Sequence, residues 1–172
     1  MSKCLNLTLA ASAACLIVGC ATQPRTDLTS AQRTQRVRTT AYTHTEKGGP
    51  RNALGDRLSS HHVMSAASDW SRFPLGTHFR IADTNEEYII DDYGTALIGT
   101  DTIDLYKTNR LAMKKWGVRH VDIAILKWGS EEESLKVLKP RCKHRCARQM
   151  VVSLEKKRGK TVAQASSART SL

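Results

Sequence analysis

Three aspartates, Asp69, Asp92 and Asp104, stand beside runs of apolar residues. Asp104 alternates with Ile103 and Leu105, so in a strand it faces away from them, to solvent or into a cleft. A carboxyl group can protonate a leaving oxygen only when its pKa is raised toward the working pH. Clustered carboxylates raise the pKa of one of them because like charges close together cannot all ionise cheaply. The alternative for each aspartate is a structural role as the cap of a turn.

The elements that would position these aspartates are short strands. Segments rich in β-branched and apolar residues alternate with turn signals of Gly, Pro and Asn. They predict six strands, over residues 37–43, 63–67, 77–82, 88–90, 102–106 and 121–128. One helix is predicted over 109–116, and Gly117 is its natural stop. We expect a mainly β fold, a small closed barrel with one inserted helix, and Trp116 and Trp128 in its core.

Four segments in series carry a distinctive pattern. They read AYT from residue 41, SAASDWSRFPLGT from residue 65, DDYGTALIGTDTIDLY from residue 91 and WGVRHVDIAIL from residue 116. Together they resemble the 3D (three-aspartate) domain, which is similar to the catalytic part of membrane-bound lytic transglycosylase A and to the stationary-phase survival muralytic enzymes. The resemblance covers residues 37–129 and is most specific over 89–106. It implies a double-psi β-barrel, as a domain over residues 36–129.

The resemblance also implies a reaction. The three family aspartates correspond to Asp69, Asp92 and Asp104, and the catalytic acid corresponds to Asp104. The implied activity is that of a lytic transglycosylase, which cleaves the bond from N-acetylmuramic acid to N-acetylglucosamine in peptidoglycan strands. The C6 hydroxyl of the substrate attacks in such enzymes, so one acid that later acts as a base suffices. The reaction needs no metal ion and no other cofactor.

Residues near the aspartates are predicted to contact the glycan. They are Tyr42, Thr43, Trp70, Tyr93 and Gly94. The aromatic members of this set could stack on sugar rings. A substrate role for His44 and Glu46, which sit near the presumed cleft, is the less favoured interpretation.

The chain departs from the usual family pattern, which reads D-T-G-G-A-I-K-G before the last aspartate. Ile98 stands in place of the lysine and Thr95 in place of one glycine. One additional residue separates Gly99 from Asp104, which makes Asp101 an alternative acid. A non-catalytic peptidoglycan-binding module is therefore the alternative function.

The N-terminal residues predict export and a lipid anchor. An apolar segment of about signal-peptide length, too short for a comfortable membrane span, ends in the run Leu16-Ile17-Val18-Gly19-Cys20. That run resembles the lipobox of bacterial lipoproteins. We expect a signal peptide over 1–19, then a lipidated Cys20 and a flexible tether over 20–35. Because Ala21 follows the cysteine, an outer-membrane lipoprotein facing the periplasm is expected; the alternative is ordinary cleavage, which gives a free periplasmic protein.

Basic charge is concentrated near the C-terminal end. The formal net charge is +11, and residues 139–172 hold ten basic side chains and one acidic one, Glu155. Nucleic-acid binding is not expected, because the chain carries an export signal and no aromatic residue lies among these charges. The basic residues within 139–172 are expected to contact polyanions, either the carboxylates of peptidoglycan or the phosphates of lipids. A chain ending at residue 138 is expected to keep its fold; in the alternative, apolar residues of the tail pack against the barrel.

Residues 130–172 are predicted to form a partly helical extension. The run Ser130-Glu131-Glu132-Glu133 resembles a capping box that opens a helix, and Pro140 interrupts this helix. A second helix is expected from Arg141 to about Glu155. The small and polar residues 162–172 are expected to be disordered.

Two cysteines, Cys142 and Cys146, remain once the predicted leader and anchor are set aside. The expected compartment is oxidising and allows a disulfide, although cysteines four apart in a helix are poorly oriented for one. A disulfide or a pair of free thiols is favoured over a metal site with His144, because no fourth ligand lies nearby.

Overall fold

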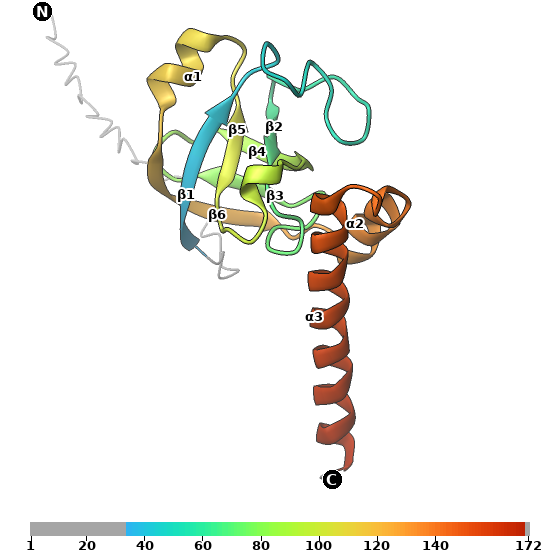
Figure 1. The fold of residues 1–172 in the computed structure, drawn as a ribbon. Coiled ribbons are helices and arrows are strands. Elements are labelled where there is room, and N and C mark those ends of the chain that lie inside the picture. The colour runs from blue at the N-terminus through green and yellow to red at the C-terminus, as the bar shows by residue number, and fades with distance from the viewer. Residues whose placement is uncertain (1–33, 171–172) are drawn as a thin grey trace, which may run out of the picture. The chain divides into compact units, whose positions relative to one another are not determined.

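The computed structural model describes residues 34–170, and six strands in this range close a barrel (Figure 1). Their order around the barrel is β1-β5-β2-β4-β3-β6. Their bounds are Thr34–Tyr42 (β1), Val63–Ala67 (β2), His78–Ile81 (β3), Glu87–Asp92 (β4), Ile103–Tyr106 (β5) and Arg119–Lys127 (β6). The six predicted strands are all present, so the prediction of a mainly β barrel is confirmed. The predicted signal peptide, Cys20 and residues 20–33 of the tether lie outside the described residues, whereas residues 34–35 of the predicted tether belong to β1.

Parallel and antiparallel pairs alternate around part of the barrel. β1 runs parallel to β5, and β2 runs parallel to β4. An antiparallel pairing of β2 with β5 joins these two pairs side by side. β6 pairs antiparallel with both β3 and β1 and so closes the barrel, with Thr34 of β1 opposite Ala124 of β6. This arrangement places β1, β5, β2 and β4 next to one another.

The barrel core forms from side chains that alternate along the strands. On β5, Ile103 and Leu105 are buried, and Asp104 between them points away from the core, as the alternation predicts. Trp116 is buried as predicted, and its Nε1 donates to Thr39 Oγ1 (3.2 Å). The prediction that Trp128 packs in the core is wrong. Trp128 is 46% exposed, because β6 ends one residue earlier and the chain has turned out of the barrel.

The inserted helix α1 (Arg110–Trp116) lies where the sequence predicts it. The Asn109 side chain caps its first turn by accepting from the Ala112 backbone N–H (2.9 Å). Gly117 ends the helix with φ 64°, a left-handed conformation that favours glycine.

Two further helices follow the barrel. Ser130 caps α2 (Glu131–Leu138) by accepting from the Glu133 N–H (3.1 Å), as the capping box predicts. A short 3₁₀ turn over Lys139–Arg141 contains Pro140 and leads to α3 (Arg145–Thr170). The prediction that residues 162–172 are disordered is wrong as far as Thr170. Alanine, which has the highest helix propensity, recurs at residues 163, 165 and 168 of this stretch.

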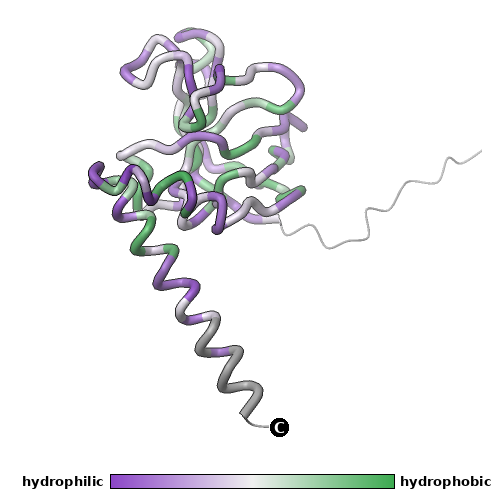
Figure 2. The backbone as a smooth tube through the Cα atoms, turned by 90° about the vertical axis from the view of Figure 1, so that its right-hand side faces the viewer, coloured by the Kyte–Doolittle hydropathy of each residue, from purple (hydrophilic) through white to green (hydrophobic). Residues whose placement is uncertain are grey.

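The first turns of α3 complete the hydrophobic core. The buried residues that the extension contributes are Leu135, Leu138, Ala147, Met150, Val151 and Leu154. They belong to the same cluster as Trp70 and Phe73, and the Trp70 backbone N–H points at the Met150 sulfur (3.4 Å). Figure 2 shows the apolar part of α3 at its barrel end and a hydrophilic stretch beyond it. The alternative in which apolar residues of the tail pack against the barrel is therefore correct, and we now expect a chain ending at residue 138 to lose part of its core.

The two cysteines of the extension are free thiols in the structure. In the described part of the chain, no group of three or more His, Cys, Asp or Glu side chains is arranged to hold a metal ion. No helix within residues 34–170 is both long enough and apolar enough to span a membrane.

Candidate active site

Two of the three aspartates lie in one row of cross-strand neighbours. Thr40 of β1 pairs with Asp104 of β5, Asp104 pairs with Ala67 of β2, and Ala67 pairs with Asp92 of β4. Residues in register on neighbouring strands present their side chains to the same face of the sheet. Asp104 and Asp92 are two strand spacings apart, about 10 Å between Cα atoms. The methyl group of Ala67 between them leaves the space above it open.

This row forms the floor of a cleft of about 570 Å³. Its volume falls in the range of small-molecule sites. The residues of the row line it, as do Arg38 and Glu46 and the segment from Gly94 to Leu97, which includes the 3₁₀ helix η1 (Thr95–Leu97). Of the predicted glycan contacts, four line the cleft: Tyr42, Thr43, Tyr93 and Gly94. We call this space the acidic cleft.

Asp104 is held in place from β1. The Thr40 hydroxyl donates to Asp104 Oδ1 (2.6 Å). Burial is the main cause that raises the pKa of Asp104 above its usual value, and the nearby Glu46 carboxylate adds to it. The Thr40 hydrogen bond and the Arg38 guanidinium act in the opposite direction and lower the pKa. The net rise keeps a larger fraction of Asp104 protonated, which is the state that a general acid needs.

Asp92 has a raised pKa for similar reasons. Burial is the largest cause and, with the charges of Asp91 and Asp104, raises the pKa of Asp92 to about 6, although the Tyr93 and Ala53 amides oppose the rise. The Tyr93 N–H donates to Asp92 Oδ1 (2.9 Å). The sequence predicts that clustering of carboxylates perturbs the site; the structure shows that burial contributes more than clustering.

Sequence reasoning missed the contribution of Asp91, which is buried behind the cleft. The Ser65 hydroxyl (2.6 Å) and the Asn52 amide (2.9 Å) donate to Asp91 Oδ2. Asp91 Oδ1 is buried without a hydrogen-bond partner among the described residues, and burial raises the pKa of Asp91. Arg141 of the C-terminal extension donates to the Ala53 carbonyl (2.7 Å) and so holds the loop that carries Asn52. The sequence does contain a signal for this buried acid. Asp91 and Asp92 are adjacent in a strand, so alternation points one of the two side chains inward.

Tyr42 brings a hydroxyl into this group of carboxyls. Burial, and then the charges of Asp92, Asp91 and Asp104, raise the pKa of Tyr42 far above its usual value, so the phenol stays protonated. Its hydroxyl and that of Thr43 are buried and have no hydrogen-bond partner within the described part of the chain. Both residues line the acidic cleft, and their two uncommitted hydroxyls lie covered beside it. The arrangement can hold a polar substrate and exchange a proton with it.

The family comparison agrees with the barrel and its aspartates. Residues 64–127 match the family model described as the 3D domain. This part of the chain is a 3D domain. It includes β2 to β6 and the three aspartates, whereas β1, with Thr40 and Tyr42, precedes the matched residues and completes the barrel. None of the curated proteins compared matches the chain.

The third aspartate of the 3D domain lies outside the acidic cleft, which corrects the prediction that it joins the other two. Asp69 is 2% exposed. Its Oδ1 accepts from the Ser71 N–H (2.8 Å) and hydroxyl (2.7 Å), and its Oδ2 accepts from the Gly99 N–H (2.7 Å). Asp69 therefore fixes a turn and the end of the loop that forms one wall of the cleft. This is the capping role that the sequence left as the alternative.

Three further positions of the 3D domain are settled by the geometry. Trp70 is fully buried and its Nε1 donates to the Asp92 carbonyl (2.8 Å), so the prediction that it stacks on a sugar is wrong. Asp101 is exposed, pairs with Arg72 (3.4 Å) and does not line the acidic cleft, so it is not the alternative acid. Ile98, which replaces the lysine of the expected family pattern, lines a different cavity.

The raised pKa of Asp92 predicts a pH-dependent effect on stability. A carboxyl whose pKa rises on folding, from 3.8 to about 6, favours the native state below its unfolded pKa and loses that contribution as the pH rises through the folded pKa. The free energy of unfolding of Asp92→Asn should therefore increase relative to that of the wild type as the pH rises from about 4 to about 7. The expected increase is on the order of 2 kcal/mol. Urea denaturation at both pH values measures the difference. A gap that stays constant with pH would contradict the raised pKa.

Proposed function

We propose that the protein is a lytic transglycosylase-like enzyme of peptidoglycan turnover, which cleaves the bond from N-acetylmuramic acid to N-acetylglucosamine with Asp104 as the acid. The observation that carries the proposal is the position of Asp104, in register with Thr40 on the floor of an open cleft, with its pKa raised by burial. The family model over residues 64–127 supports a domain of this kind. We also propose that the barrel is of the double-psi type, which its two parallel pairs support.

The proposed reaction needs Asp104 to transfer two protons in turn, first as an acid and then as a base. Protonated Asp104 gives its proton to the glycosidic oxygen as the bond to the muramyl C1 breaks. The Asp104 carboxylate then takes the proton of the muramyl C6 hydroxyl as that oxygen attacks C1, which gives a 1,6-anhydro product and restores the acid. Asp92, ionised above its pKa of about 6, faces the same cleft and can stabilise the positive charge that develops on the sugar. Tyr42 and Thr43 line the cleft beside the glycan.

Digestion of purified sacculi tests this function. The full chain is incubated with sacculi, and the soluble products are analysed by mass spectrometry for 1,6-anhydro muropeptides. Their release is the expected result. Sacculi that bind the protein but release no fragments would instead favour the non-catalytic binding module. Fragments with reducing muramic acid ends would indicate a hydrolase, because water would then be the nucleophile.

We further propose that the protein is a lipoprotein of the outer membrane facing the periplasm. The lipobox-like run ending at Cys20 and the residue Ala21 support this location. Several acyl chains on one cysteine give stable attachment, whereas a single chain binds only reversibly. An anchored enzyme would act on the peptidoglycan layer within reach of its tether.

Cys20→Ser is expected to release the protein from the membrane fraction, because serine cannot form the thioether that carries the lipid. Fractionation of cells followed by immunoblotting measures the distribution. Cys4→Ser is the matched control, since Cys4 lies in the predicted leader, and this variant should stay with the membranes. If Cys20→Ser still sediments with outer membranes, another segment is the anchor.

A further inference from the structure

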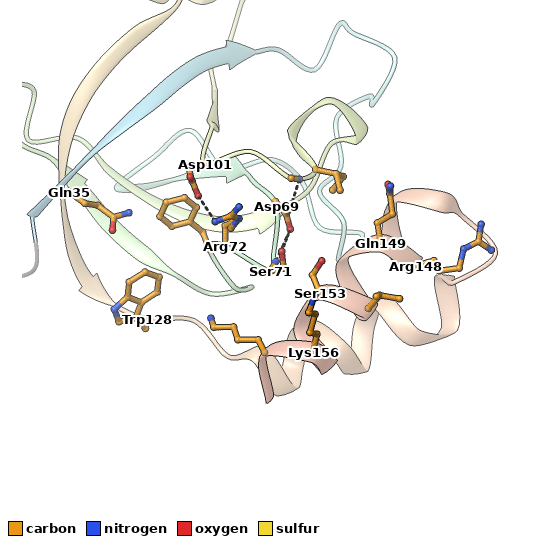
Figure 3. A pocket seen from close by; sticks show the side chains of 15 residues that line it. Gln35, Asp69, Ser71, Arg72, Asp101, Trp128, Arg148, Gln149, Ser153 and Lys156 are labelled. Atoms are coloured by element: carbon orange, nitrogen blue, oxygen red, sulfur yellow. Dashed lines mark hydrogen bonds and ion pairs between the residues drawn. The ribbon is translucent and has the colours of Figure 1, made fainter. Parts of the chain in front are cut away.

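A second and larger cavity, of about 920 Å³, lies between the barrel and α3 (Figure 3). The barrel contributes the turn after Asp69, the segment around Gly99 and Trp128, and α3 contributes one face from Arg148 to Lys157. In Figure 3, Ser153 and Lys156 on α3 lie across the cavity from Ser71 and Arg72 on the barrel. We call this space the basic cleft.

The charge of the basic cleft is positive. Four basic and two acidic side chains line it. Arg72 and Lys157 form ion pairs with Asp101 and Glu131. The other two cations, Arg148 and Lys156, have no ion-pair partner among the described residues. The acid at the back of the cleft, Asp69, has both its oxygens occupied by hydrogen bonds. A bound anion would therefore meet uncommitted positive charge.

An aromatic surface accompanies these cations. The Trp128 indole stacks on Phe73, with ring centroids 6.2 Å apart and planes inclined by 12°, and leaves its other side exposed. Val152 of α3 is 60% exposed at the same cavity. A ligand that fits combines carboxylate groups with short apolar segments, as a peptide does. A neutral glycan strand would leave the cations without a partner.

The two clefts share one wall. The loop of residues 94–99 presents Gly94 to Leu97 to the acidic cleft and Ile98 and Gly99 to the basic cleft. The hydrogen bond from Gly99 to Asp69 anchors this loop at the basic side. Two parts of one branched molecule could therefore lie on the two sides of the loop.

We propose that the basic cleft binds a carboxylate-bearing peptide. The identity of this peptide rests on the proposed function. It is the stem peptide attached to the muramyl residue of the glycan that lies in the acidic cleft. Lys156 pairs with one of its carboxylates, and Trp128 contacts its apolar side chains. The cleft selects peptidoglycan that still carries its peptides.

Binding of a glycan-free peptide tests the proposal. The probe is the stem tetrapeptide released from sacculi by an amidase, and binding to the full chain in detergent is measured by calorimetry and by tryptophan fluorescence. Lys156→Glu should weaken binding at least tenfold. Lys160→Glu makes the same charge change on the same helix outside the cleft and should bind like the wild type. The same peptide with its carboxyl groups amidated should bind at least tenfold more weakly.

Several outcomes would overturn the inference. Equal affinities of the two lysine variants, or equal binding of the amidated peptide, would show that the cleft does not recognise peptide carboxylates. Inorganic phosphate that displaces the peptide at equal concentration would show a general anion site instead. Because the probe contains no glycan, these failures leave the proposed cleavage untouched. Tight peptide binding by a protein that releases no anhydro products would reject the enzyme and keep the basic cleft.

Discussion

Replacing Asp104 with Asn is expected to lower the rate of glycan cleavage by about 10²- to 10⁴-fold, the usual contribution of a general acid. Asn keeps the shape of the side chain and can still accept the Thr40 hydrogen bond, but it cannot donate and recover a proton. The fold should be intact, as judged by an unchanged circular dichroism spectrum. Release of 1,6-anhydro muropeptides from sacculi measures the rate. In the wild type this rate should fall as the pH rises through the raised pKa of the acid.

Asp101→Asn is the matched control for this experiment. Asp101 stands three positions before Asp104, is exposed and lies outside the acidic cleft. The same chemical change there should leave cleavage close to that of the wild type. If Asp101→Asn abolished cleavage and Asp104→Asn did not, Asp101 rather than Asp104 would be the acid.

Leu154→Ala is expected to destabilise the protein by about 2–5 kcal/mol, as truncation of a fully buried leucine does. Leu154 is fully buried on the face of α3 that joins the barrel core. Its loss leaves a cavity where the extension packs, so the effect tests whether α3 belongs to the folded unit. The free energy of unfolding from urea denaturation measures it.

Val152→Ala provides the comparison. Val152 is two residues away on the same helix and is 60% exposed, so its truncation should change stability by less than about 0.5 kcal/mol. Equal effects of the two substitutions would mean that α3 does not pack as the structure has it. A full loss of folding on removal of residues 139–172 would agree with the larger effect at Leu154.

Much of the barrel was predictable because each strand carries its own local signal. Alternation on β5 also gave the direction of Asp104, with Ile103 and Leu105 buried on either side of it. The row from Thr40 to Asp92 could not be predicted from local pattern, because it depends on which strands become neighbours and in which register. Alternation says which face a side chain takes, but not what stands beside it.

The errors at Asp69 and Trp70 have a common physical origin. Both residues precede a tight turn, where Asp69 accepts from Ser71 two positions on, a local arrangement that aspartate favours. The family motif predicts a site role for Asp69, whereas this local pattern predicts that it caps a turn. Trp70 is buried between the barrel, where its indole contacts Tyr93, and α3, where Met150 lies 80 positions away in the sequence. A sequence window around Trp70 contains nothing of α3.

The pairing of β1 with β6 also determines when the protein can fold. Thr34 lies opposite Ala124, so the barrel cannot close until nearly all of its strands are available. Bringing such distant segments together lowers the conformational entropy of the chain before favourable contacts can form. Folds rich in distant pairings therefore form slowly. Burial of Trp70 and Phe73 waits still longer, for the arrival of α3. A chain made from its N-terminus therefore cannot complete this fold until both β6 and α3 have been synthesised.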